Sequence, residues 1–404
     1  MDWSDTPEHA AFRVQVRTFI RERLPERYVP PPNIPAADPG DIWLSDRASE
    51  DPEVREAARE WAAALGEHGW VAAHWPREYG GAGLGPIEQL IFGEEMAQAG
   101  APRVGGLGVS LLGPTVIVHG TPEQRSEIIP RILSGEVVWA QGYSEPAAGS
   151  DLASLQTSAR ADGDQYVING QKIWTTGGHL ADALFALVRT DPASPKHRGI
   201  SFVYLDIKAP GVQVRPIVNL AGSHTFNEVF FEDVRVPMTQ RLGEENRGWY
   251  VAMTLLDFER SGIGIVSSAR TAVRRLISEA ARDERATRRI RDHAMLRHNI
   301  VDCWIAGEVA YNFSLNTASM QSAGRIPNHE ASITKMFATE MHQRAVTAAL
   351  RAFGLYGGVI DPQTGPIAPF VKAYMETLSL TIAGGTSEIQ RHVIATRGLG
   401  LPRS

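Results

Sequence analysis

The sequence predicts an α+β fold in which a helical region, a β region and a second helical region follow one another. Apolar residues recur at helical spacing up to about residue 135, at a period of two from about 137 to 240, and at helical spacing again from about 245 to 397. We therefore expect an N-terminal α-helical domain at 1–136, a central antiparallel β domain at 137–243 and a C-terminal four-helix bundle at 244–404.

The helices of the first region are predicted from apolar spacing and from their ends. They are expected around residues 12–20, 52–69 and 86–98. Another helix is expected to begin at Thr121-Pro122, because threonine can cap a helix and proline suits its first turn.

The period of two in the central region predicts strands broken by Gly, Asp and Pro. The expected strands are residues 165–169, 183–188, 200–206 and 228–236. No helical segment separates them, which favours antiparallel pairing. The long helices expected after them are residues 247–281, 288–321, 329–354 and 366–382.

The composition excludes several classes of protein. With 40 basic and 46 acidic residues the net charge is −6, which lacks the basic excess of a nucleic-acid-binding protein. No apolar run is long enough to span a membrane, and the acidic start lacks the pattern of a secretory signal, so we expect a cytoplasmic protein. The single cysteine, Cys303, excludes an internal disulfide and a thiolate metal cluster, and its apolar neighbours predict a buried thiol. We expect no metal site.

The C-terminal region contains a glycine pair before a predicted helix. Gly384-Gly385 allows close backbone approach, and Ser387 with Gln390 has the spacing of a capping box. A helix N-terminus behind glycines is a ready anion site, although a plain helix cap has the same pattern. No Rossmann or P-loop glycine pattern occurs, so a nucleotide cofactor would bind in another way.

Several segments resemble signatures of the acyl-CoA dehydrogenase family, in the family's order over nearly the whole chain. They are Trp75–Gly83, Gly120–Arg125, Tyr143–Asp151, Asn169–Gly177 and Gly384–Arg391. The resemblance implies a helical, a β and a helical-bundle domain, an FAD cofactor, and oxidation of an acyl-CoA thioester to its 2,3-enoyl form in lipid β-oxidation.

The resemblance also implies which residues contact the cofactor. The predicted FAD contacts are Gln141, Tyr143, Ser144, Ser150, Trp174, Thr176, Gly354, Gly358, Thr386 and Glu388. An aromatic face at Trp174 suits a planar ring system, whereas the alternative for this residue is a core tryptophan in a strand. Ser150 is expected at a phosphate and in the substrate site, with a turn hydroxyl as the alternative.

The catalytic base is expected at Glu259. Many family members carry a glutamate at the position of Gly384, which has no side chain but whose N–H could hold the thioester oxygen. A second group, resembling isovaleryl-CoA and long-chain dehydrogenases, has its glutamate on an earlier helix, in register with Glu259. Independently, Glu259 falls on an apolar stripe, and desolvation there would raise its pKa towards that of a general base.

The alternatives for this site are a structural ion pair of Glu259 with an arginine, and Glu388 as the base. By resemblance, Asp257 and Arg260 touch the substrate or brace the helix. We expect a branched or bulky acyl chain, including a sterol side chain, because Gly384 leaves room beside the flavin.

The segment at Arg282–Arg289 lacks the family's R-x-x-F-G pattern for a neighbouring subunit's FAD, and the glycine element around Gly354 and Gly358 is altered. Such losses resemble divergent bacterial members that assemble with a second dehydrogenase chain. A hetero-oligomer or a homo-oligomer is therefore expected, with an electron-transfer flavoprotein as electron acceptor. The competing functions are a flavin oxidase or monooxygenase on the same fold and a non-catalytic partner subunit.

Overall fold

The computed structural model describes residues 5–30, 42–258, 263–323, 325, 327–360 and 368–402, with backbone alone for 254–258 and 263. The chain folds as two compact units. One, which we call the mixed unit, comprises Gly40–Leu84 and Pro102–Glu259, and the other, the helical unit, comprises Met1–Pro39, Gly85–Ala101 and Arg260–Ser404. The three domains expected from periodicity stay a prediction.

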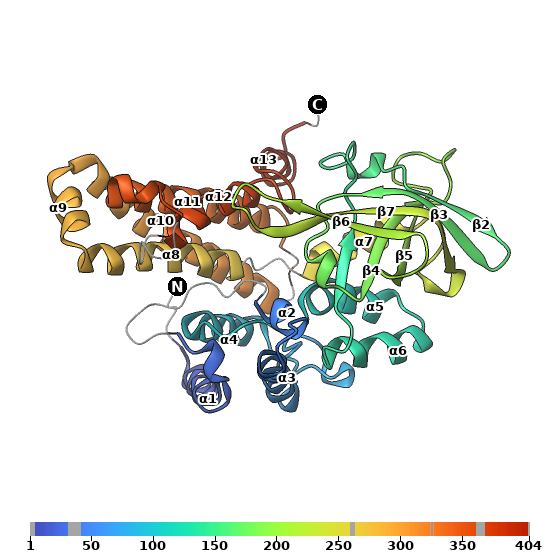
Figure 1. Cartoon of the computed structure of the whole chain (residues 1–404), viewed down its shortest axis with the longest axis horizontal. Helices are drawn as coiled ribbons and strands as arrows, with labels where there is room; N and C mark the ends of the chain where they lie inside the picture. Colours follow the sequence, from blue (N-terminus) through green and yellow to red (C-terminus); the bar gives the residue numbers. More distant parts are fainter. Residues whose placement is uncertain are drawn as a thin grey trace. The chain divides into compact units, whose positions relative to one another are not determined.

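The mixed unit contains a sheet and the helices around it. Its helices are α2 (Ile42–Arg47), α3 (Pro52–Glu67), α5 (Gly113–His119), α6 (Pro122–Leu133) and α7 (Gly248–Phe258). Its strands are β1 (Trp139–Gly142), β2 (Ser158–Asp162), β3 (Gln165–Lys172), β4 (Ala183–Arg189), β5 (Ile200–Asp206), β6 (Val212–Val218), β7 (His224–Pro237) and β8 (Arg241–Leu242). In Figure 1, α5 and α6 lie along one side of this sheet.

The described strands form one 8-stranded sheet in the order β6-β7-β3-β2-β4-β5-β8, with β1 beside β4. Most neighbours are antiparallel, as expected, but β1 runs parallel to β4 and β2 pairs in parallel with β4 at one position. A parallel pair needs a long connection between its strands. The connection from β1 to β4 is long because it holds the β2–β3 hairpin.

The four strands expected from the period of two are confirmed as β3, β4, β5 and β7. The exposed strands β2 and β6 were missed because each lies mostly open to solvent and so lacks a clean apolar alternation. Strands β4 and β5 are buried along almost their whole length, which matches their continuous apolar runs.

The helix starts follow the capping rules. Helices α3, α4 (Pro86–Ala99) and α6 are confirmed, each with proline in its first turn. The Thr121 hydroxyl accepts from the Gln124 amide at 3.3 Å, and the Gln124 side chain accepts from the Thr121 amide at 3.0 Å. These two bonds make a capping box that fixes where α6 begins.

The helical unit packs long helices side by side. Its helices are α1 (Pro7–Arg23), α4, α8 (Ile263–Arg282), α9 (Glu284–Asp292), α10 (Ala294–Ser322), α11 (His329–Phe353), α12 (Ala368–Leu380) and α13 (Ser387–Val393). Figure 1 shows α8, α10 and α11 running together with α9 at one end, and α12 packs on α11. The expected helix 247–281 is described as α7 and α8, and residues 259–262 lie outside the described residues.

Cys303 of α10 is a free, buried thiol, as the sequence predicts. It packs with Val273 of α8 and Ala345 of α11. Burial raises the pKa of the thiol, so the residue acts as a small apolar filler between three helices. Within the described ranges no helix combines the length and apolarity that crossing a membrane requires.

The start of α7 touches the backbone of β5. A Cβ placed on Gly248 would stand 2.3 Å from the amide nitrogen of Phe202 and 2.3 Å from the carbonyl carbon of Ser201. Both are backbone atoms of a buried central strand and cannot move aside. Gly248 therefore sets how closely α7 can approach the sheet.

We expect Gly248→Ala to lower the free energy of unfolding by about 3 kcal/mol, because the new methyl group overpacks the contact with β5. The matched control is Gly66→Ala in α3, where a Cβ meets nothing within 4 Å. That control should be neutral or stabilising by up to about 1 kcal/mol. Denaturant titration followed by circular dichroism compares the two variants, and equal midpoints would contradict the close-approach argument.

Candidate functional site

Two of the sequence motifs lie next to each other in the mixed unit. The segment after β1 begins at Tyr143, and the segment after β3 begins at Ile173. The amide of Ile173 donates to the carbonyl of Ser144 at 2.9 Å, and the Lys172 ammonium donates to the carbonyl of Tyr143 at 3.2 Å. The structure thus brings together segments that are nearly thirty residues apart in the chain.

Trp174 lies outside the strand core. It follows the end of β3, its side chain is 56% exposed, and its φ of 61° is in the left-handed region. Its ring meets that of Phe226 edge to face, with centroids 5.9 Å apart. The alternative of a core tryptophan is therefore wrong, and the ring forms an open aromatic surface.

The residues after Trp174 are held by the beginning of β7. Thr175 exchanges backbone hydrogen bonds with Asn227 at 3.0 and 3.1 Å, and the amide of Gly177 donates to the carbonyl of Thr225 at 2.9 Å. The Thr175 hydroxyl is buried and has no hydrogen-bond partner, whereas Thr176 is half-buried. The backbone that presents Trp174 and Thr176 is therefore fixed by an ordered ladder.

The other predicted contacts of this unit differ in exposure. Gln141 and Ser144 are half-buried and Ser150 is exposed, so each has a face open to a ligand. The Tyr143 ring packs edge to face against Phe185 and Phe202, at 5.9 and 6.4 Å between centroids. Burial raises the pKa of the Tyr143 phenol, which therefore stays protonated.

In the helical unit the glycine pair forms a left-handed turn before α13. Gly384 has φ 62° and Gly385 has φ 85°. The helix cap is Thr386, whose hydroxyl accepts from the Ile389 amide at 3.2 Å, so the expected cap at Ser387 is wrong by one residue. Thr386 and Ser387 both carry a hydroxyl that can cap a helix, and the capping-box spacing to Gln390 led to the prediction of Ser387.

The carbonyls of this turn are bound from within the helical unit. Lys335 of α11 donates to the carbonyl of Gly385 at 2.8 Å, and the Gln390 side chain donates to the carbonyl of Gly384 at 2.9 Å. No described atom stands within 4 Å of a Cβ placed on Gly384. The turn is held by its carbonyls, and the space where a side chain would stand is open.

Glu388 is a poor candidate for a buried base. Its side chain is 80% exposed, and it lies 3.7 Å from the Arg391 guanidinium. Its helix-terminal backbone amide and the Thr386 hydroxyl hold the pKa of the carboxyl below its ordinary value. Glu388 is therefore ionised and turned to solvent.

The glycine element after α11 is engaged by α9. The Arg289 guanidinium occupies the space beside Gly354, 2.5 Å from the position of a Cβ there. Arg285 donates to the Tyr356 hydroxyl at 3.0 Å, and Gly358 has open space beside it. The sequence did not single out Arg289, although its place in an arginine-rich helix was visible.

The predicted base and its neighbours fall on the part of the chain without described side chains. Glu259 and Arg260 lie outside the described residues, and Asp257 is described only as backbone of α7. Their roles stay predictions.

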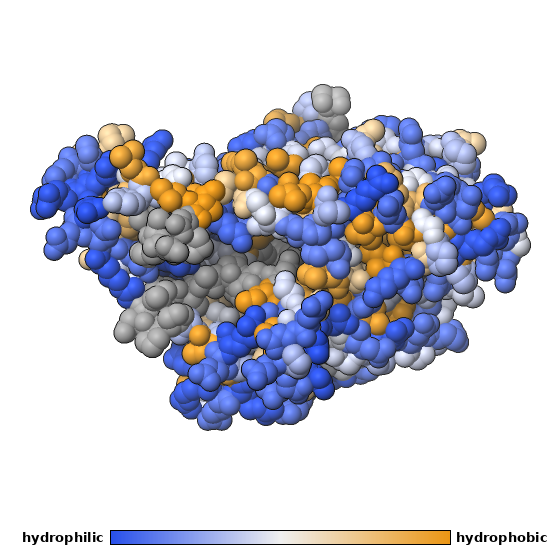
Figure 2. All heavy atoms as spheres, viewed as in Figure 1, coloured by the Kyte–Doolittle hydropathy of each residue, from blue (hydrophilic) through white to orange (hydrophobic). Residues whose placement is uncertain are grey.

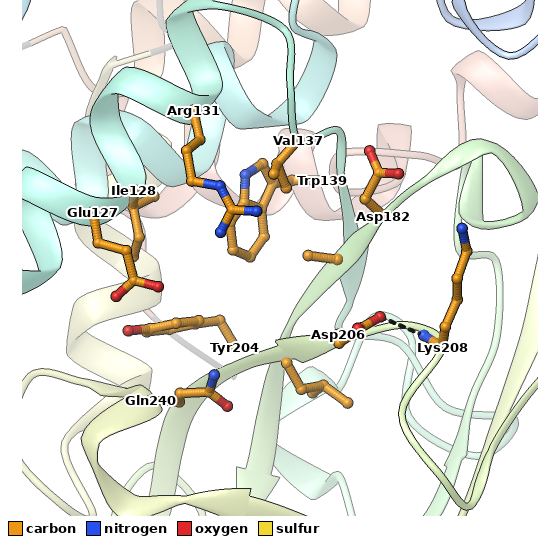
Figure 3. Close-up of a pocket in the computed structure, with 12 residues that line it drawn as sticks. Glu127, Ile128, Arg131, Val137, Trp139, Asp182, Tyr204, Asp206, Lys208 and Gln240 are labelled. Atoms are coloured by element: carbon orange, nitrogen blue, oxygen red, sulfur yellow. Dashed lines mark hydrogen bonds between the residues drawn. The ribbon is translucent and has the colours of Figure 1, made fainter.

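A cavity of ≈ 280 Å³ lies elsewhere in the mixed unit, between α6 and the strands β1, β4 and β5. Figure 3 shows Glu127, Arg131 and Tyr204 facing it, and the amide of Lys208 donating to the Asp206 carboxylate at 2.7 Å. Arg131 is paired with Glu136 at 3.0 Å. None of the motif residues named above lines this cavity.

Three sequence models match consecutive segments of the chain. They describe the N-terminal domain of acyl-CoA dehydrogenase at residues 44–136, its middle domain at 140–234 and its C-terminal domain at 246–399. The chain belongs to the acyl-CoA dehydrogenase family. This confirms the resemblance, the fold class and the enzyme class expected from the sequence, an FAD-dependent acyl-CoA dehydrogenase.

Individual relatives agree over the whole length. The chain is 37% identical to the acyl-CoA dehydrogenase IpdE1 of Mycobacterium tuberculosis, covering 97% of each chain. Among solved structures, the Tcur3481-Tcur3483 steroid ACAD is 30% identical with a TM-score of 0.81, covering all of both chains. The ChsE4-ChsE5 complex of Mycobacterium tuberculosis is 32% identical with a TM-score of 0.77, also covering all of both chains.

The described residues fit a flavin. An exposed indole offers a face for a planar ring, and the buried Thr175 hydroxyl has unused hydrogen-bonding capacity beside it. In the helical unit, a glycine turn precedes the N-terminus of α13, an arrangement that suits an anionic group.

We expect Trp174→Ala to weaken FAD binding about tenfold while changing the free energy of unfolding of the apoprotein by less than about 0.5 kcal/mol, because the ring is mostly exposed. Trp174→Phe, which keeps an aromatic face, should bind FAD within a few fold of the parent. Titration of apoprotein with FAD, followed by flavin fluorescence, gives the affinities. If Trp174→Ala instead strongly lowered the free energy of unfolding and left the affinity for FAD unchanged, Trp174 would be a structural residue and not a cofactor contact.

Proposed function

We propose that this chain oxidises an acyl-CoA thioester to the 2,3-enoyl-CoA, with FAD bound at the predicted contacts and with Glu259 as the base. The observation that carries the proposal is the joining of segments 143–145 and 172–174 around an exposed Trp174. When bound, FAD supplies the hydride acceptor. The protein's part is to orient the thioester, exclude water and remove the α proton.

The proton is proposed to move to the Glu259 carboxylate. Position 384 carries no side chain, and Glu388 is exposed with a lowered pKa that makes it a weak base, so the choice of Glu259 rests on its register with the family's earlier-helix glutamate. The Gly384 N–H is proposed to donate to the thioester oxygen and so stabilise the charge that develops there. Asp257 and Arg260 are proposed to contact the CoA portion, and Ser150 to contact both cofactor and substrate.

The acyl group is proposed to be branched or bulky, including a sterol side chain. The open space at Gly384 supports this, because no described atom blocks it. The Tcur3481-Tcur3483 steroid ACAD, which shares the fold over the whole chain, is consistent with such a substrate.

The protein is proposed to work as an oligomer, either with itself or with a second dehydrogenase chain. On the face drawn in Figure 2 apolar side chains form small patches within a mostly hydrophilic surface. Helix α10 carries exposed apolar residues along its outer side in addition to its buried side, namely Met295, Val301, Trp304, Ile305 and Val309. Such a stripe on one helix supports an interface with another chain.

The hetero-oligomer is supported by the altered glycine element, where Arg289 covers Gly354, and by a relative solved as the two-chain ChsE4-ChsE5 complex. An electron-transfer flavoprotein is the proposed electron acceptor, and a cytoplasmic location stays a prediction.

The two competing functions make different predictions for the purified protein. An oxidase or monooxygenase would show rapid reaction of the reduced flavin with oxygen. A non-catalytic partner subunit would hold little flavin and would be insensitive to changes at Glu259.

We expect Glu259→Gln to bind FAD normally and to lose turnover by about 10³-fold or more, because the amide cannot accept the α proton. The test is anaerobic bleaching of the flavin absorption by an accepted acyl-CoA thioester. Glu22→Gln in α1, which changes a carboxylate that is 61% exposed and belongs to no predicted contact, serves as the matched control and should bleach at nearly the parent rate. Full activity of the Glu259 variant would place the base elsewhere.

We also expect a panel of acyl-CoA esters with an artificial electron acceptor to give the highest kcat/KM for branched or sterol-derived chains. Gly384→Ala should lower activity on the bulkiest esters most, both by filling the open space and by straining a left-handed backbone. Exclusive activity on short straight chains would refute the substrate proposal while leaving the dehydrogenation intact.

A further inference from the structure

A buried salt bridge joins the two motif segments Tyr143–Asp151 and Asn169–Gly177. Lys172 is 0% exposed and Glu145 is 9% exposed, and the ammonium nitrogen lies 2.8 Å from Oε1 of the carboxylate. By contrast, the pair of Lys196 with Asp151 in the same unit is 61% and 59% exposed. Taking two charges out of water is costly unless every hydrogen-bonding position is used.

The buried pair uses most of its hydrogen-bonding positions, namely both oxygens of Glu145 and two of the three ammonium protons of Lys172. The two oxygens of Glu145 accept from the backbone amides of Gln156 at 2.7 Å and Thr157 at 2.8 Å, in addition to Lys172. The Lys172 ammonium also donates to the carbonyl of Tyr143 at 3.2 Å. One ion pair therefore ties together the end of β3, the start of the segment 143–151 and the approach to β2.

The protonation of both groups agrees with this arrangement. Burial lowers the pKa of Lys172 to about 8, and the Glu145 charge limits this fall. Burial raises the pKa of Glu145, but Lys172 and the hydrogen bonds outweigh it and hold the pKa below its ordinary value. At neutral pH the pair is ionised.

Trp174 has a strained backbone, and the chain is hydrogen-bonded on both sides of it. A residue other than glycine in the left-handed region persists only when the chain is held on both sides of it. On one side are Lys172 and Ile173, bonded to residues 143–145. On the other side is Thr175, paired with Asn227 of β7.

We propose that the Glu145–Lys172 pair is a positioning device that holds the segments 143–151 and 172–177 in register and so presents Trp174 to the planar ring of the cofactor. The inference rests on the proposed FAD binding. It assigns these two side chains a role through Tyr143, Ser144 and Trp174 and not by contact with the reacting atoms.

The experiment compares FAD affinity with the stability of the apoprotein. Lys172→Met leaves a lone buried carboxylate, so it should lower both the melting temperature and the affinity. The double variant Lys172→Met with Glu145→Gln removes both charges and should recover melting temperature relative to the single variant. Its Kd for FAD should stay raised at least tenfold, and the visible circular dichroism of the bound flavin should change. The matched control, Lys372→Met, removes the exposed pair with Glu376 in α12 and should alter neither property.

A second variant, Glu145→Asp, keeps both charges but shortens the reach to the amides of residues 156 and 157. We expect it to melt cooperatively and to bind FAD at least threefold more weakly. A purely structural ion pair would leave FAD affinity unchanged. The proposal is therefore overturned if the double variant and Glu145→Asp both bind FAD with a Kd within twofold of that of the parent. Titration of the unchanged parent apoprotein with FAD is done first. If the parent does not bind FAD, the proposed function fails; if the parent binds FAD and the variants bind it equally well, only the positioning role fails.

Discussion

A buried ammonium group requires a carboxylate and carbonyl oxygens around it, and in the mixed unit Lys172 obtains both from residues 143–145. Because Lys172 ends β3 and Glu145 follows β1, this requirement joins two parts of the sheet that do not pair with each other as strands. The exposed Trp174 directly follows that junction, and the ladder of Thr175 and Gly177 with β7 follows Trp174. In the helical unit, Lys335 binds the carbonyl of Gly385 in a comparable way.

The local sequence was sufficient to predict most of the helices and the buried strands. Pro52 and Thr121-Pro122 predicted the beginnings of α3 and α6. The period of two predicted the places of β4 and β5, although both strands are buried along almost their whole length. The exposed strands carry no such signal, and the parallel pairing of β1 with β4 depends on the path of the chain between them. The cap of α13 shows the limit of a spacing rule, because Thr386 and Ser387 are chemically equivalent as caps.

For the site, the motifs identified the segments but not the side chains that hold them. Trp174 and Tyr143 were visible as residues of a known pattern, and the structure adds that one is exposed on a strained backbone while the other is locked between phenylalanines. Phe226 was missed because the strand expected at 228–236 begins earlier, at His224. The alternation through Thr225, Phe226 and Asn227 could have extended that strand. Arg289 and Lys335 act across helices, which single-sequence periodicity does not report.

The left-handed turn at Gly384 has a consequence for how this branch of the family can change. The space beside the α carbon is free, so crowding does not exclude a larger residue there. The backbone does, because at φ 62° any L side chain is strained. Introducing an acidic side chain at position 384 would therefore require the torsion angles of the turn to change together with the residue.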